Sequence, residues 1–104
     1  MIYEVRTYRL QVGAIGEYLR LVGTEGIVIQ QSYLGQLVGY FPSEIGPLNE
    51  ITHIWAYRDL EDRRQRRQAL QADPKWVAFL PKIQTLNVEM QNKILLPTEF
   101  SPLQ

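Results

Sequence analysis

His53 is the residue best suited to acid–base chemistry, because it is the single histidine of the chain and imidazole alone titrates near neutral pH without help. On a predicted strand it shares a face with Ile51, Trp55 and Tyr57. The functional interpretation is a proton acceptor, or a donor to a bound ligand. The alternative is a partly buried histidine bonded to backbone or to a tyrosine. An unpaired imidazole would cost about 1 to 3 kcal/mol, so we expect Tyr8, Tyr57 or water to bond an accessibly titrating ring.

Arginines form a second candidate group, in and beside the segment 60–72. At about 100° per residue, Arg63 and Arg67 fall on the same arc as the leucines of this segment, so both guanidinium groups point toward its apolar side. The functional interpretation is an anchor for a carboxylate or phosphate on a small ligand. The alternative is a solvated face with weak ion pairs at i,i+4, namely Asp59–Arg63 and Asp62–Arg66.

Aromatic side chains with a polar tip are frequent, with six tyrosines and two tryptophans. In an enzyme, Tyr8 and Tyr57 could orient a substrate and Trp55 could form a wall of its pocket. Packing in a core or an interface is the alternative explanation for all of them.

Several kinds of chemistry are excluded or disfavoured. The absence of cysteine excludes disulfides, thiol catalysis and cysteine-ligated metals. One histidine cannot make a multi-histidine site, and the glutamates show no metal-ligand spacing, so we expect no metal. No Gly-rich phosphate loop and no nucleophile beside a base occurs. The cofactor, including any haem or flavin, is left undefined.

The elements that must position these residues follow from hydrophobic periodicity. Asp59 and Asp73 are suitable N-caps, and Gly23 and Gly26 predict a break or kink near Thr24. The predicted elements are a strand 2–10, a helix 14–33, strands 37–41 and 51–58 as a hairpin, a helix 60–72, a second short helix from Pro74, and a long strand 86–96.

This order is β-α-β-β-α-β, which predicts an α+β, ferredoxin-like fold: an antiparallel four-stranded sheet with the helices on one face. The other face would carry residues such as Trp55 or Tyr57 or their alternates, an apolar patch that usually marks an interface or a pocket. We therefore expect a homodimer or a higher homo-oligomer that buries this face. The strand 86–96 and an extended tail after Pro97 would reach toward the partner.

Length and charge limit the organisation and the partners. With 104 residues, 45% hydrophobic and 21% charged, we expect one globular domain over 1–104. The balance of 11 basic and 11 acidic side chains removes the electrostatic argument for nucleic acid or an anionic membrane as partner. No apolar run approaches the roughly 18 to 20 residues of a membrane span, and charges interrupt the first ten residues, so we expect a cytoplasmic protein.

The order and spacing of several segments closely resemble the NIPSNAP family over essentially the whole chain. The segments are IYEVRTY (2–8), EIGPLN (44–49), HIWAY (53–57), the arginines of 63–67, and Asp73-Pro74-x-Trp76 with Phe79. The resemblance implies a ferredoxin-like domain of the dimeric α/β-barrel superfamily, in which two sheets pair face to face. That superfamily includes cofactor-independent monooxygenases, haem-degrading enzymes and muconolactone-isomerase-like proteins. Roles of larger eukaryotic members in vesicle trafficking and mitochondrial quality control are not carried over.

Two functional hypotheses remain open, with a purely structural assembly protein as a third. The first is a small-molecule enzyme with His53 as acid/base or donor, Tyr8 and Tyr57 orienting the substrate, Trp55 as a wall, and Arg63 or Arg67 anchoring an anionic group. The second is a non-catalytic ligand-binding or protein-interaction module that uses the same pocket or the sheet interface. A pocket of roughly 300 Å³ or more beside His53 would favour a ligand.

Overall fold

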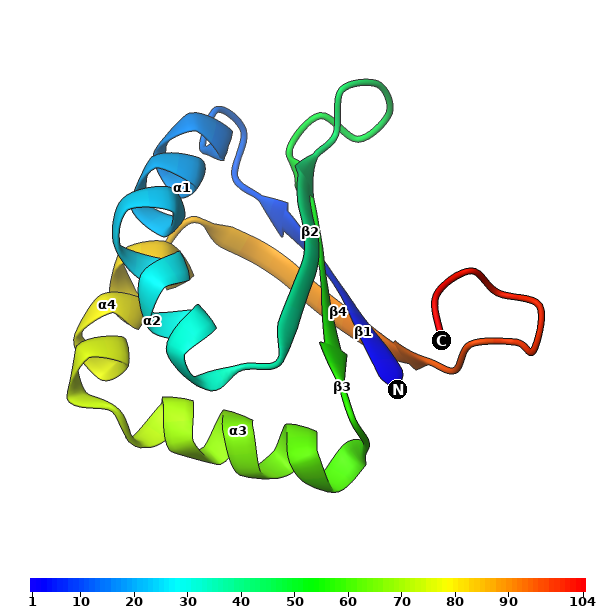
Figure 1. Ribbon diagram of the computed structural model, residues 1–104. Helices are drawn as coiled ribbons and strands as arrows, with labels where there is room; N and C mark the ends of the chain where they lie inside the picture. The colour runs from blue at the N-terminus through cyan, green and yellow to red at the C-terminus, as the bar shows by residue number, and fades with distance from the viewer.

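Strands and helices alternate in the order expected from the sequence, as Figure 1 shows. The computed structural model describes residues 1–104. The elements are β1 (Ile2–Leu10), α1 (Ile15–Leu21), the π-helix η1 (Val22–Gly26), α2 (Ile27–Tyr33), β2 (Gln36–Pro42), β3 (Glu50–Tyr57), α3 (Leu60–Ala72), α4 (Pro74–Gln84) and β4 (Asn87–Leu95). No helix combines the length and the apolar content needed to cross a membrane.

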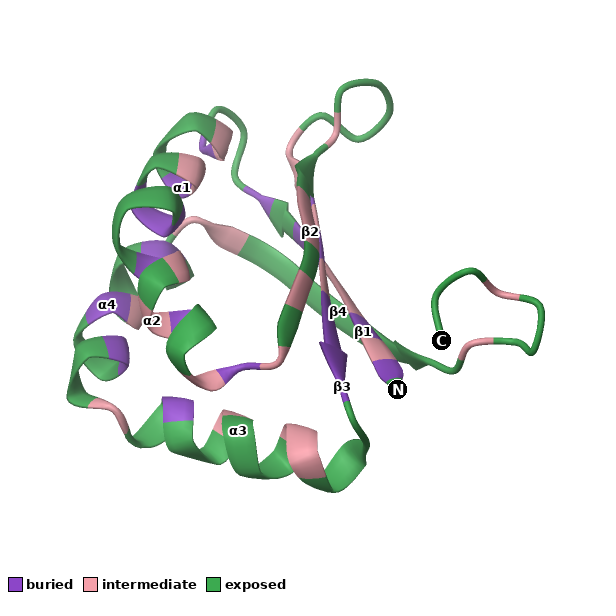
Figure 2. Ribbon diagram, in the orientation of Figure 1, coloured by how far each residue is buried: buried purple, intermediate pink, exposed green.

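The four strands form one antiparallel sheet in the order β2-β3-β1-β4. All helices lie on one side of it, and the two central strands are the most buried (Figures 1 and 2). The predicted α+β, ferredoxin-like fold is therefore confirmed. The core lies between the helices and the sheet, where Leu10, Ile51, Trp55 and Tyr18 are at most 1% exposed.

The predicted break near Thr24 does not occur, because the backbone widens into the π-helix η1 instead. Tyr18, Val22 and Gln30 are all buried against the sheet at multiples of four residues. Each step of four residues would drift about 40° around a regular α-helix. The i→i+5 turn of a π-helix turns less per residue, so it reduces this drift and keeps the three side chains on one side.

Both predicted N-caps are confirmed. The carboxylate of Asp59 accepts a hydrogen bond of 2.7 Å from the backbone N–H of Asp62, and Asp73 accepts one of 2.6 Å from that of Lys75. These bonds satisfy donors that a helix start leaves unpaired, so α3 and α4 begin where the sequence places them.

Trp55 and Tyr57 lie on the helix-covered face of the sheet. They point toward the helices and are 0% and 1% exposed. The residues that alternate with them along the strands form the helix-free face. On the free face β1 contributes Tyr3 and Val5, and β3 contributes Ile54 opposite Val5.

The tail after β4 is not extended but curls back on itself. The side-chain amide of Gln104 donates to the backbone carbonyls of Thr98 and Ser101. The backbone carbonyl of Gln104 accepts a hydrogen bond from the Tyr3 hydroxyl at 3.0 Å. Figure 1 shows this segment on the side of the sheet opposite the helices.

Candidate functional site

A row of polar side chains crosses the helix-covered face of the sheet. Tyr40 on β2 pairs with His53 on β3, His53 pairs with Arg6 on β1, and Arg6 pairs with Asn92 on β4. Paired residues of neighbouring strands point to the same face, so the antiparallel register alone brings these four side chains together. The sheet is thus polar across its middle, beneath the helices.

His53 is enclosed by aromatic rings and is 1% exposed. Its ring stacks on Tyr40 with centroids 4.4 Å apart and meets Tyr8 edge-on at 5.0 Å. The indole Nε1 of Trp55 donates to His53 Nδ1 at 2.8 Å. With Nδ1 acting as acceptor, the neutral ring carries its proton on Nε2, and this atom is buried without a partner. Burial, assisted by the charge of Arg6, lowers the pKa of His53 to about 3.

The expected bond from Tyr8 or Tyr57 and the expected titration of His53 near neutral pH are therefore both wrong. Its ring is bonded by the Trp55 indole and not by Tyr8 or Tyr57, because residues two apart on a strand lie side by side on one face. The ring also does not titrate near neutral pH, because the helices cover the face on which it lies. At neutral pH this histidine is an uncharged donor.

A buried carboxylate, that of Glu4, lies beside the arginine and asparagine side chains of this row. Glu4 is fully buried, and its Oε2 accepts hydrogen bonds from Arg6 at 2.9 Å, Arg63 at 2.7 Å and Asn92 at 2.6 Å. Burial by itself raises the pKa of Glu4, but the bonds from Arg63 and Asn92 and the charge of Arg6 lower it to about 2. Arg63 thus pairs with Glu4 across the fold and not with Asp59 on its own helix, while the predicted Asp62–Arg66 pair forms at 2.8 Å.

Arg67 lies one helical turn beyond Arg63 and is half-buried, but no hydrogen bond or ion pair engages its guanidinium. Burial and the nearby charge of Arg6 lower its pKa. Three guanidinium groups, those of Arg6, Arg63 and Arg67, therefore lie around one carboxylate, that of Glu4, which bonds only the first two. The positive charge of Arg67 has no counterpart in the protein.

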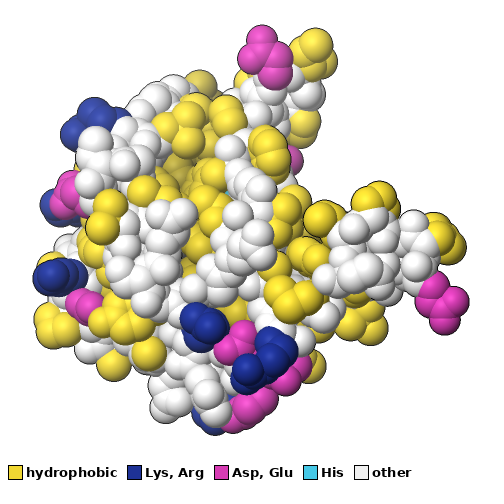
Figure 3. Space-filling view, in the orientation of Figure 1, with side chains coloured by type: hydrophobic (Ala, Val, Ile, Leu, Met, Phe, Trp, Pro, Cys, Tyr) yellow, Lys and Arg dark blue, Asp and Glu magenta, His cyan; other side chains and the backbone are white.

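Two cavities meet at this cluster. An inner cavity of about 150 Å³ lies between the sheet and the helices and includes His53 and Trp55 in its wall. An outer cavity of about 290 Å³ is lined by Arg63 and Asn92. Both cavities share the residues Arg6, Tyr8, Arg67 and Met90, and no acidic residue lines either one. Figure 3 shows hydrophobic side chains gathered in a hollow between the α1–α2 side and β2.

Comparison with known proteins decides the family. The NIPSNAP family model matches residues 3–102. The chain belongs to the NIPSNAP family. Protein NipSnap of Drosophila melanogaster is 37% identical over 99% of this chain, and the homologue of Dictyostelium discoideum is 34% identical over 95%. The chain spans only 37% and 44% of the length of these two relatives.

Solved structures agree with this NIPSNAP assignment. A NIPSNAP family protein with unknown function from Agrobacterium tumefaciens is 60% identical, covers 100% of this chain and 94% of that chain, and superimposes with a TM-score of 0.97. An antibiotic biosynthesis monooxygenase is 15% identical, covers 94% of this chain and 99% of its own, and has a TM-score of 0.70, which shows a shared fold alone.

The residues singled out in the sequence divide into two groups. His53, Tyr8, Trp55 and Arg67 line the inner cavity of this NIPSNAP chain. The other two do not: Arg63 lines the outer cavity and is engaged by Glu4, and the Tyr57 hydroxyl is buried without a partner.

Sequence reasoning missed Glu4, Arg6 and Asn92 as members of the site. The alternation of β1 contained a signal for the first two, because Glu4 and Arg6 share a face with the apolar Ile2 and Leu10. Asn92 lies in a polar, exposed strand and offered no signal.

Metal and cofactor ligands are not apparent in this NIPSNAP chain. No group of three or more His, Asp or Glu side chains is placed to hold a metal ion. The inner cavity beside His53, at about 150 Å³, does not reach the roughly 300 Å³ at which ordinary ligand and cofactor sites begin, so only a compact molecule fits there. His53, the one candidate axial ligand, is closed in by Trp55, Tyr40 and Tyr8, so the site does not fit haem or flavin.

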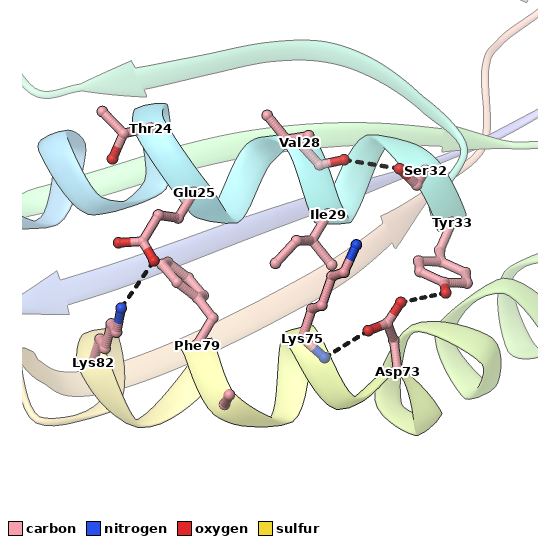
Figure 4. Close-up of a pocket in the computed structure, with 11 residues that line it drawn as sticks. Thr24, Glu25, Val28, Ile29, Ser32, Tyr33, Asp73, Lys75, Phe79 and Lys82 are labelled. Atoms are coloured by element: carbon pink, nitrogen blue, oxygen red, sulfur yellow. Dashed lines mark hydrogen bonds and ion pairs between the residues drawn. The ribbon is translucent and has the colours of Figure 1, made fainter.

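A third and larger hollow, of about 640 Å³, lies on the outer surface between α2 and α4 (Figure 4). Both of its carboxylates are engaged: Glu25 pairs with Lys82 at 2.8 Å, and Asp73 accepts from the Tyr33 hydroxyl. None of its side chains is a buried polar group without a partner. The cavity beside His53 is therefore the better candidate for a functional site.

Proposed function

We propose that this NIPSNAP domain binds a small organic molecule in the cavity between sheet and helices, and acts on it as an enzyme through the His53 Nε2–H group. The observation that carries the proposal is a buried ring nitrogen with no partner in the wall of a cavity. A buried donor without an acceptor costs about 1 to 3 kcal/mol, and an oxygen of a ligand would offset that cost.

The chemistry that this geometry supports is stabilisation of negative charge on an oxygen of the substrate. A neutral imidazole donor held by Trp55 costs no reorganisation when that charge develops. Tyr8 stands beside His53, and its hydroxyl accepts from Arg6 Nε at 2.7 Å, so its own proton can be given to the ligand.

The alternative function is binding without turnover. It is favoured by the low pKa of His53, which leaves no group in the cavity that accepts a proton readily at neutral pH. Under this alternative the same ligand would leave the protein unchanged.

Native mass spectrometry of protein purified from its own cells tests the proposal. We expect a bound small molecule in the parent and its loss in His53→Asn, which keeps an acceptor for the Trp55 indole but removes Nε2. Arg64→Gln is the matched control, because Arg64 is exposed and pairs only within α3. If parent and His53→Asn carry the same molecules in the same amounts, the proposal is wrong. If the released molecule is recovered unaltered after incubation with the parent protein, that result favours binding without turnover.

The proposed assembly is a homodimer through the helix-free face. Tyr3, Val5, Ile54 and Val38 line a hollow of about 310 Å³ between this face and the tail. The tail adds Phe100, which is 89% exposed. Contiguous apolar surface of this kind marks interfaces. We expect Ile54→Glu to yield monomers in sedimentation equilibrium and the exposed-helix control Arg64→Gln to stay dimeric. A parent that sediments at 12.1 kDa would contradict the dimer.

The cytoplasmic location stays a prediction.

A further inference from the structure

We propose that the ligand is a small monocarboxylic acid whose carboxylate pairs with Arg67 and whose compact, oxygen-bearing carbon skeleton fills the inner cavity. This inference rests on the proposed function, because it names the class of molecule for the same site. Charge, volume and the positions of the unpaired polar atoms each support a part of it.

The charge argument concerns the guanidinium groups around the cavities. Arg6 and Arg63 are neutralised in part by Glu4, to which both donate. Arg67 has no such partner, although it is half-buried and lines both cavities. A buried charge without a counter-ion is costly, and a planar guanidinium matches a carboxylate with two parallel hydrogen bonds. Three guanidinium groups and one carboxylate leave two positive charges in excess, so the charge favours an anionic ligand, and the planar fork of Arg67 fits the two oxygens of a carboxylate.

The volume argument limits the uncharged part of the ligand. An apolar cavity of about 150 Å³ accommodates benzene in another protein, and the inner cavity here has about this volume. Its apolar wall includes the side chains of Val22, Leu34, Leu70, Trp76, Leu80 and Ile83. One six-membered ring or a six-carbon chain therefore fits, and a nucleotide does not.

The donor argument concerns the deep end of the ligand. His53 lines the inner cavity only, whereas Arg67 lines both, so a ligand spanning the two residues has its carboxylate toward the outer cavity. The Nε2–H group of His53 needs an oxygen acceptor. Gln30 and Asn87, also in the inner wall, each have a buried amide oxygen without a partner, which a ligand hydroxyl can satisfy. A hydroxyl or enol oxygen meets both requirements.

The test uses 4-hydroxybenzoate as the probe and 4-hydroxybenzamide as its uncharged counterpart, with the His53 ring ¹⁵N signals followed by NMR. The chain has one histidine, so these signals need no further assignment. We expect 4-hydroxybenzoate to shift the Nε2 signal and to bind at least about tenfold more tightly than the amide. Arg67→Gln should weaken it about ten- to a hundredfold, Arg67→Lys less, and Arg64→Gln not at all.

Each contrary result has a distinct meaning. Equal binding of 4-hydroxybenzoate and its amide, unchanged in Arg67→Gln, would overturn the carboxylate class while leaving a ligand site in place. If phenyl phosphate binds more tightly than 4-hydroxybenzoate, and if that binding depends on Arg67, the ligand is a phosphate and not a carboxylate. If none of the three probes, nor an uncharged set including phenol and cyclohexanone, shifts the His53 signal, the proposed function fails together with this inference.

Discussion

The indole Nε1 of Trp55 donates a hydrogen bond of 2.8 Å to Nδ1 of His53, two residues earlier on the same strand. This bond selects the tautomer of the ring, because Nδ1 must be bare and the proton must reside on Nε2. It also aligns a buried donor with the cavity between sheet and helices. The chemistry available to this NIPSNAP domain therefore depends on a contact within one strand.

The first prediction concerns that tautomer. The ¹⁵N shifts of the single histidine should show a protonated Nε2 and a bare Nδ1 at pH 7, and should remain unchanged down to about pH 5, because burial lowers the pKa of His53 to about 3. In Trp55→Phe the bond is lost and the two tautomers should mix. A ring that gains a second proton near pH 6.5 in the folded parent would contradict the enclosed geometry.

The second prediction is a loss of stability on mild acidification. His53 has a folded pKa of about 3 and an ordinary value of 6.5, so below pH 6.5 the unfolded state binds a proton that the folded state does not. The free energy of unfolding should fall by about 2 to 3 kcal/mol between pH 6.5 and 4.5, measured by urea titration. This decline should be much smaller in His53→Asn, because only the first part of the carboxylate titration remains. An equal decline in both proteins would assign it to other groups.

The third prediction concerns the buried carboxylate. The stabilisation from Glu4 is present above its ordinary pKa of 4.5 and is lost as the pH falls toward the folded value of about 2. Glu4→Gln leaves Arg6 and Arg63 without a counter-ion and should cost about 3 to 5 kcal/mol at pH 7. The exposed Glu61→Gln, which breaks the surface pair with Arg64, should cost less than about 1 kcal/mol. Thermal and urea unfolding of both variants provide the check.

The fourth prediction concerns the entry to β2. A Cβ at Gly35 would lie 2.0 Å from the carbonyl oxygen of Ala56, a backbone atom that cannot move aside. Gly35→Ala should therefore destabilise the protein by about 2 to 4 kcal/mol in urea unfolding. Gly23→Ala is the matched control, because a Cβ there meets nothing within 4 Å and alanine favours the helix by up to about 1 kcal/mol. Equal stabilities would contradict the close approach.

Local physics was sufficient for the elements of the fold. The alternation of β1, the caps Asp59 and Asp73, and the apolar stripe of α4 each act over a few residues, so their boundaries could be predicted to within about two residues. The π-helix η1 could not be predicted in this way, because the two glycines of its segment are equally compatible with a kink. The widened turn is stabilised by packing, in which Gly26 lets Phe79 of α4 come close.

The sequence by itself determined the α+β architecture and the inward orientation of Arg63 and Arg67 on their helix, since both follow from periodicity. Only the tertiary structure decided which partners they meet. Glu4 and Arg63 are 59 positions apart, and Glu4 and Asn92 are 88 apart, so the packing of α3 on the sheet and the pairing of β1 with β4 bring them into contact. The same packing removed water from His53 and left Arg67 without a counter-ion. Solvation and long-range pairing belong to the folded chain, which is why a strand pattern could indicate a histidine but not its protonation state.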